Sequence, residues 1–106
     1  MLYQMFSMQK RLQKLITNTE TPCDNIDQFH YSVTALVCEL GEVLQADKRW
    51  KNNGRNDHYD RDEKLEELVD CFAFLINACL YSGFTSRDIY LAFVKKFNTN
   101  VERTMK

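Results

Sequence analysis

Apolar positions recur at intervals of three and four residues along most of the chain, and this spacing predicts helices. The apolar stripes predict a first helix from Leu2 to about Asn18, a second from about Asp27 to Lys51 and a third from about Arg61 to Ser82. Thr85 and Asp88 form a capping-box pattern, which predicts a fourth helix that runs to about Thr104. Alternation typical of strands is nearly absent. The pattern therefore predicts one all-α, four-helix bundle-like domain over residues 1–106.

The third predicted helix carries the most apolar run of the chain, residues 68–81, interrupted only by Asp70 and Asn77. A helix that is apolar nearly all round must be enclosed, and three neighbouring helices from a chain of 106 residues can hardly cover it. We therefore expect a homodimer or homotetramer with this helix buried near the subunit interface. The run is shorter than the ~20 residues that span a bilayer, and the N-terminus lacks a signal-peptide pattern. We expect no membrane association and a cytoplasmic location.

Composition excludes some partners. The 14 basic and 15 acidic residues leave a formal charge of -1, so no single-sign field indicates a nucleic-acid partner. The four cysteines, at positions 23, 38, 71 and 79, form no Cys-x-x-Cys pair. Three of them lie in apolar helical patterns, so we interpret them as small reduced core residues rather than disulfide or zinc cysteines.

Carboxylates gather on two of the predicted helices. Glu39 and Glu42 form a Glu-x-x-Glu pair on the second helix, and Glu67 and Asp70 form a Glu-x-x-Asp pair on the third. A buried carboxylate needs a partner, and a metal ion is one. We therefore expect these four side chains to bind a divalent cation. Hard oxygen ligands without Cys or His favour Mg²⁺, with Mn²⁺ as a substitute.

The fourth predicted helix carries Lys96, Asn100 and Arg103 on one face, spaced by four and then three residues. Two cations and an amide on one face could hold a polyphosphate. A metal site together with such cations is what hydrolysis of a nucleoside triphosphate requires, because the phosphate charge must be neutralised while water attacks phosphorus.

Simpler explanations exist for each signal. A lone Glu-x-x-Glu pair is usually a solvated helix face, and Asp70 and Asn77 could belong to a core polar network. The Lys96, Asn100 and Arg103 face could be ordinary solvent-exposed surface near a helix C-terminus. Trp50 could anchor a core or an interface rather than stack on a base.

Taken together, these residues resemble the all-α nucleoside triphosphate pyrophosphohydrolases, which include MazG-like proteins and the dimeric dUTPases. The similarity rests on Glu39-Leu-Gly-Glu42, on Glu66-Glu67-Leu-Val-Asp70 and on the later Lys96, Asn100 and Arg103, and it covers roughly residues 27–104. Trp50-Lys51 resembles the aromatic-Lys segment of the dimeric dUTPases and points to a pyrimidine. The resemblance implies hydrolysis of a nucleoside triphosphate, dUTP or a related pyrimidine or aberrant nucleotide, to the monophosphate and pyrophosphate.

The resemblance also implies roles for these residues. It assigns the metal to Glu39, Glu42, Glu67 and Asp70, with Glu39 or Glu42 also orienting or deprotonating the attacking water. It assigns substrate contacts to Trp50, Lys51, Asn77, Lys96, Asn100 and Arg103, and possible supporting roles around the metal to Glu63 and Glu66.

Other functions stay open at this point. A non-catalytic helical oligomerisation module would explain the apolar third helix, and a nucleotide-sensing protein would bind without turnover. A di-iron carboxylate bundle fits less well, because it needs Glu-x-x-His pairs and no His lies three residues after a Glu.

Overall fold

The computed structural model of the protein describes residues 1–18, 23–51 and 58–105. All named secondary structure in these residues is helical: α1 (Leu2–Thr17), α2 (Ile26–Ala46), α3 (Arg61–Leu80) and α4 (Ser86–Met105). The predicted all-α fold class is confirmed, and the helix ends lie within two residues of the predicted ones except at the end of α2. Residues 52–57, the middle of the connection between α2 and α3, lie outside the described residues.

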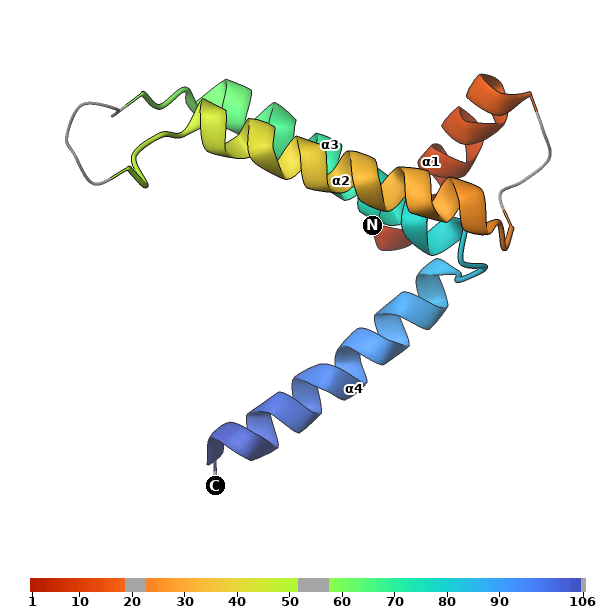
Figure 1. Ribbon diagram of the computed structural model, residues 1–106. Coiled ribbons are helices and arrows are strands. Elements are labelled where there is room, and N and C mark those ends of the chain that lie inside the picture. The colour runs from red at the N-terminus through yellow and green to blue at the C-terminus, as the bar shows by residue number, and fades with distance from the viewer. Residues whose placement is uncertain (19–22, 52–57, 106) are drawn as a thin grey trace.

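The four helices differ in how much they contact one another. Helices α2 and α3 lie side by side and run in opposite directions, and α1 crosses α3 near its C-terminal end (Figure 1). Helix α4 extends away from the other three (Figure 1). The buried core cluster of Phe6, Ile76 and Leu80 lies where these helices meet, and Ile89 from the beginning of α4 packs against it. The core is therefore concentrated at one end of the α2–α3 pair.

Side-chain caps fix where α2 and α3 begin. The Asn25 side-chain oxygen accepts a hydrogen bond from the Gln28 backbone N–H at 3.1 Å, and the Asp60 carboxylate accepts one from Glu63 at 3.1 Å. Each cap satisfies a backbone donor that has no partner inside its helix. Both helices therefore start at positions set by local chemistry.

Gly83 ends α3, as the sequence predicts. Its φ of +82° is in the left-handed region, where glycine has no Cβ to strain. The Phe84 N–H donates to the Cys79 carbonyl and the Gly83 N–H to the Leu80 carbonyl, both at 3.0 Å, which is the Schellman pattern.

The predicted capping box then starts α4. The Thr85 N–H donates to the Asp88 carboxylate at 2.9 Å, and the Asp88 N–H donates to the Thr85 hydroxyl at 3.1 Å. Two consecutive turn motifs therefore fix the direction in which α4 leaves α3.

The prediction that the second helix continues to Lys51 is wrong, because α2 ends at Ala46. Asp47 has extended backbone angles and forms an isolated antiparallel bridge with Tyr59. Its carboxylate accepts hydrogen bonds from Arg49 and Lys64. These contacts between the two ends of the connection outweigh the local preference for helix, so α2 ends early. The spacing of apolar residues does not reveal such contacts.

Burial differs from the expectation for α3. Its buried residues all lie in its C-terminal half, whereas Val69 and Phe72 are 56% and 57% exposed. The apolar face that we expected to be enclosed is thus uncovered in the single chain. No described helix is long and apolar enough to cross a membrane.

The cysteines follow the prediction only in part. All four are free, Cys71 is buried and Cys79 is partly buried. Cys38 is exposed, so its interpretation as a core residue is wrong for the single chain. Cys23 is also exposed.

Truncation of the core tests this packing. Ile76 is 5% exposed, and Ile76→Ala is expected to lower the free energy of unfolding by about 2–5 kcal/mol, because it leaves a cavity in the core. Chemical denaturation followed by circular dichroism measures the change. The matched control is Ile16→Ala, at a side chain that is 66% exposed, which should change stability by less than about 0.5 kcal/mol. Equal effects of the two substitutions would contradict the placement of the core.

Candidate metal centre

The pairing of α2 with α3 brings three carboxylates together. One oxygen from each of Glu39, Glu67 and Asp70 lies within 4.8 Å of the others. Glu67 and Asp70 are three residues apart on α3 and so project toward the same side, and Glu39 faces them from α2. Glu39 and Glu67 are partly buried and Asp70 is exposed. In the part of the chain that the structure describes, this is the one group of three or more candidate ligands.

The electrostatics of this cluster favour a cation. The pKa of Glu67 is raised above its ordinary value, first by removal of the carboxyl from water, then by hydrogen bonding to Glu39 and by the negative charges of Glu39, Asp70 and Glu42. Like charges this close disfavour ionisation of one another, and a bound cation removes that cost. An all-oxygen donor set is the one that Mg²⁺ and Mn²⁺ prefer, so the residues present fit the ion that the sequence suggests.

Glu42 borders the cluster without joining the group of three. It lies one turn after Glu39 on α2, and its charge contributes to the raised pKa of Glu67. The neighbouring thiol does not supply a further ligand in its neutral form. The pKa of Cys71 is raised, chiefly by burial and then by the charges of the three carboxylates, so the sulfur stays protonated near neutral pH.

The structure does not bring the predicted basic face to these carboxylates. Lys96, Asn100 and Arg103 are exposed on the second half of α4. Helix α4 contacts the rest of the described chain near its beginning, and its second half extends away from α2 and α3 (Figure 1). Within one chain, the acidic cluster and the basic face are separate.

Asn77 is buried in the packing of α1 against α3. Its side-chain oxygen accepts a hydrogen bond from Gln9 Nε2 at 2.9 Å, and one turn later the Tyr81 hydroxyl donates to Gln13 Oε1 at 2.9 Å. The two glutamines are four residues apart, as are their two partners on α3. This match explains the position of Asn77 as part of a polar network between helices. The only sequence signal for this network was the equal four-residue spacing of Gln9 and Gln13 and of Asn77 and Tyr81.

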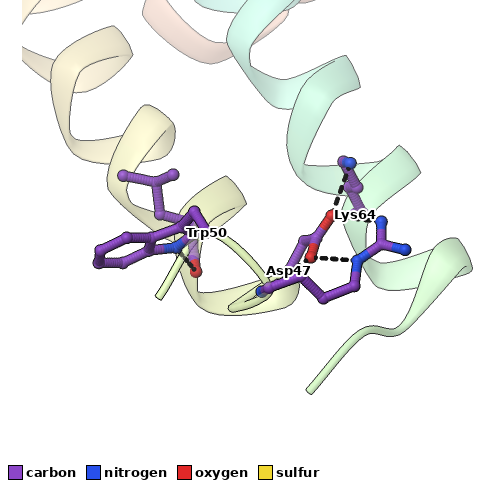
Figure 2. A network of polar contacts seen from close by, with 5 residues as sticks. Asp47, Trp50 and Lys64 are labelled. Atoms are coloured by element: carbon purple, nitrogen blue, oxygen red, sulfur yellow. Dashed lines mark hydrogen bonds and ion pairs between the residues drawn. The ribbon is translucent and has the colours of Figure 1, made fainter. Parts of the chain in front are cut away.

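Trp50 lies beyond the end of α2, at the connection to α3. Its Nε1–H donates to the Leu44 carbonyl at 3.1 Å, which fixes the indole against the end of the helix (Figure 2). The ring is about half-exposed, and Lys51 Nζ lies 5.4 Å from its centroid. The predicted pair Trp50 and Lys51 thus presents an aromatic surface and a cation together.

Asp47 holds this connection in place (Figure 2). Its carboxylate accepts hydrogen bonds from Arg49 Nε at 2.8 Å, Arg49 Nη2 at 2.7 Å and Lys64 Nζ at 2.8 Å. These bonds, from Arg49 first and then Lys64, hold the pKa of Asp47 well below its usual range. With Val43, Leu44 and Trp50, the three residues line an open depression of about 500 Å³. Sequence reasoning missed this network because its members do not share helical spacing.

A comparison with protein families identifies the chain. The family model described as dUTPase matches residues 1–82. The chain belongs to this dUTPase family. The match includes Glu39, Glu42, Glu67 and Asp70 and ends at Ser82, before α4 begins. The predicted resemblance to the all-α dUTPases is therefore confirmed at the level of the family. Searches of curated proteins and of solved structures found no match.

Substitution of Glu67 tests the metal centre. In the parent, Mg²⁺ should raise the melting temperature, because an ion that binds the folded state stabilises it. Glu67→Gln should abolish most of this increase. The matched control is Asp62→Asn, which changes an exposed carboxylate of α3 outside the group of three and should respond to Mg²⁺ as the parent does. Equal Mg²⁺ responses of parent and Glu67→Gln would place the metal elsewhere.

The pH dependence of the metal-free protein tests the same repulsion. Because the pKa of Glu67 is raised by folding, its contribution to stability is present below the ordinary carboxyl pKa of about 4.3 and is lost as pH rises through the folded value. In EDTA, the melting temperature of the parent relative to that of Glu67→Gln should therefore fall between about pH 4 and pH 7. A difference that stays constant across this range would contradict the raised pKa of Glu67 in the folded protein.

Proposed function

We propose that the protein is a Mg²⁺-dependent pyrophosphohydrolase that converts dUTP, or a related pyrimidine or aberrant nucleotide, to the monophosphate and pyrophosphate. The observation that carries the proposal is the cluster of Glu39, Glu67 and Asp70, which lies inside the segment matched by the dUTPase family. Three converging carboxylates repel a phosphate chain unless a cation lies between them. The cluster is therefore suited to a nucleotide bound together with its metal.

The carboxylates divide into two roles in this proposal. Glu39, Glu67 and Asp70 hold the ion, with Glu42 at the border of the site. Bound Mg²⁺ supplies neutralisation of phosphate charge and polarisation at phosphorus. Glu39 or Glu42 orients the attacking water and accepts its proton, since a carboxylate on α2 can act as base while those on α3 remain with the metal.

The remaining predicted residues bind the substrate. Lys96 and Arg103 donate hydrogen bonds to phosphate oxygens and Asn100 donates its amide N–H, because charge-assisted bonds of this kind hold polyphosphates. The half-exposed Trp50 ring offers a surface on which the base stacks, with Lys51 beside it. Asn77 is buried between α1 and α3 and its oxygen already accepts a hydrogen bond from Gln9, so its predicted substrate contact stays outside this proposal.

One observation favours a second candidate, a non-catalytic oligomerisation or nucleotide-sensing module. Apolar side chains on α3 and α4 are exposed in the single chain, as expected of a helical assembly surface. Turnover separates the two candidates, because an assembly or sensing module has no need to break the phosphoanhydride bond.

Product analysis tests the proposed reaction. With Mg²⁺ and dUTP, the products should be dUMP and pyrophosphate in equal amounts, as measured by ion-exchange chromatography. Glu42→Gln should reduce kcat by roughly 10²–10⁴-fold with an unchanged circular dichroism spectrum, because the charge that orients and deprotonates water is lost. Asp62→Asn, the matched control, should retain most of the parent activity. Release of dUDP and orthophosphate would refute the regiochemistry, and absence of turnover across a full panel of (d)NTPs would favour the second candidate.

Phosphate binding is tested on α4. Lys96→Ala and Arg103→Ala should each reduce kcat/KM by about 10- to 100-fold through loss of a charge-assisted hydrogen bond. The matched control is Lys95→Ala, because Lys95 is exposed and adjacent in sequence but points about 100° away from Lys96 around the helix. An equal effect of Lys95→Ala would show that the positive charge of α4 as a whole, and not Lys96 and Arg103 in particular, accounts for the loss.

A further inference from the structure

The Asp47 carboxylate joins three parts of the chain: the end of α2, the residues that follow it, and α3. It accepts hydrogen bonds from the Arg49 backbone N–H at 3.2 Å and from the Arg49 guanidinium at 2.8 and 2.7 Å. Lys64 reaches it from α3 and donates at 2.8 Å (Figure 2). The Asp47 side chain is 14% exposed, whereas those of Arg49 and Lys64 are 52% and 32% exposed. The enclosed acceptor therefore fixes the positions of its more exposed donors.

Backbone hydrogen bonds close the connection between α2 and α3 on both sides of Asp47. The Asp60 N–H donates to the Ala46 carbonyl at 3.1 Å, and the Lys48 N–H donates to the His58 carbonyl at 2.8 Å. These bonds hold the residues before and after Asp47 against the beginning of α3. Asp47 is thus at the centre of a junction and not at a free helix end.

Trp50 lies in a tight turn that starts at this junction. The Lys51 N–H donates to the Lys48 carbonyl at 3.0 Å, which closes a β-turn with Arg49 and Trp50 as its two central residues. The indole itself has one hydrogen bond, to the Leu44 carbonyl at 3.1 Å, and the residue is 52% exposed. Because so exposed a ring is held by little packing, its orientation depends on the turn that carries it.

Arg49 is the link between Asp47 and that turn. Its backbone N–H and its guanidinium are both bonded to Asp47, and the guanidinium carbon lies 3.6 Å from the centre of the Tyr59 ring. One central residue of the turn is therefore held at its backbone and at its side chain, and the next residue is Trp50. Loss of the charge of Asp47 would release Arg49 first and Trp50 with it.

The indole borders an open depression of about 500 Å³ that lies close to the metal centre. Val43, which lines the depression, follows Glu39 by four residues on α2. Lys64, which also lines it, precedes Glu67 by three residues on α3. The depression is thus about one helical turn, roughly 5 Å, from the carboxylates along both helices. In a nucleotide the sugar separates the α-phosphate from the base by a distance of this order.

We propose that Asp47 is a positioning residue for nucleotide binding: through Arg49 it holds the Trp50 indole as one wall of this depression, where the base of the substrate stacks. Asp47 remains bonded to Arg49 and Lys64 and does not contact the nucleotide. The effect on substrate rests on the proposed function, whereas the fixing of the indole rests on the contacts of Asp47 alone. Loss of its charge weakens nucleotide binding and leaves the metal centre unchanged.

Fluorescence tests the positioning without any nucleotide. Trp50 is the one tryptophan of the chain, so the intrinsic tryptophan emission reports on this ring alone. Asp47→Asn keeps the shape of the side chain and removes its charge. The emission anisotropy should fall and quenching by acrylamide should rise, with the helical circular dichroism unchanged. Unchanged anisotropy and quenching would overturn the proposal, whether or not the protein hydrolyses a nucleotide.

Two further variants make this measurement specific. Asp62→Asn, the matched control, removes a carboxylate that pairs with Arg61 on the exposed surface of α3, and it should leave anisotropy and quenching as in the parent. Arg49→Gln breaks the same bonds from the exposed partner and should lower the anisotropy as Asp47→Asn does. If Asp47→Asn loses helical structure, Arg49→Gln supplies the test, and a parent-like anisotropy in that variant would overturn the proposal.

A double-mutant cycle with dUTP tests the effect on substrate. Asp47→Asn should raise KM by roughly 3- to 10-fold, the size of one aromatic stacking contact, with kcat within about twofold of the parent. In a Trp50→Ala background, where KM is already raised, Asp47→Asn should add less than about twofold, because residues that act as one unit are not additive. A full effect of Asp47→Asn in that background, or a loss in kcat alone, would overturn the proposal. Absence of turnover of any (d)NTP would refute the proposed function and leave the fluorescence result to decide the positioning.

Discussion

Repulsion among carboxylates is the constraint on which the candidate site depends. Packing of α2 against α3 holds Glu39, Glu67 and Asp70 with oxygens within 4.8 Å, and removal of Glu67 from water together with these neighbouring carboxylates raises its pKa. Such an arrangement costs folding free energy, and the rest of the helix pair must offset it. Caps at Asn25 and Asp60 fix where the two helices begin. In the proposed function, a bound cation offsets this cost.

Two local features determine which of the predicted site residues lie near one another within one chain. Asp47 ties the end of α2 to α3 through Lys64, which closes the α2–α3 pair at the end that carries Trp50. At the other end, the Gly83 turn sends α4 away from the pair (Figure 1). The first feature brings an aromatic surface to the same helix pair as the carboxylates. The second keeps the cations of α4 apart from them within one chain.

Much of the fold was accessible from the sequence because its signals are local. Helical apolar spacing, the glycine at position 83 and the reciprocal pair Thr85 and Asp88 each act within a few residues, and the structure confirms all three. Proximity of Glu39 to Glu67 and Asp70 followed from spacing on two helices that must pack. The family match to residues 1–82 agrees with the resemblance read from those motifs.

What the sequence did not reveal depends on contacts between distant residues. The early end of α2 follows from the partners of Asp47, one of them 17 residues away, and the Gln9 to Asn77 bond joins residues 68 apart. Exposure of Cys38 and of the apolar side of α3 depends on which helices cover which faces, and α4 does not take the covering position that a closed bundle would give it. Apolar spacing predicts that a face is covered but does not specify what covers it.

The most direct test of the central claim is a titration of Mn²⁺ followed by electron paramagnetic resonance, in which only the free ion gives the strong six-line signal. The parent should remove Mn²⁺ from this signal, excess Mg²⁺ should restore it by competition, and Glu67→Gln should bind Mn²⁺ far more weakly than the control Asp62→Asn. Equal Mn²⁺ binding by Glu67→Gln and the parent would contradict the assignment of Glu39, Glu67 and Asp70 as the metal centre.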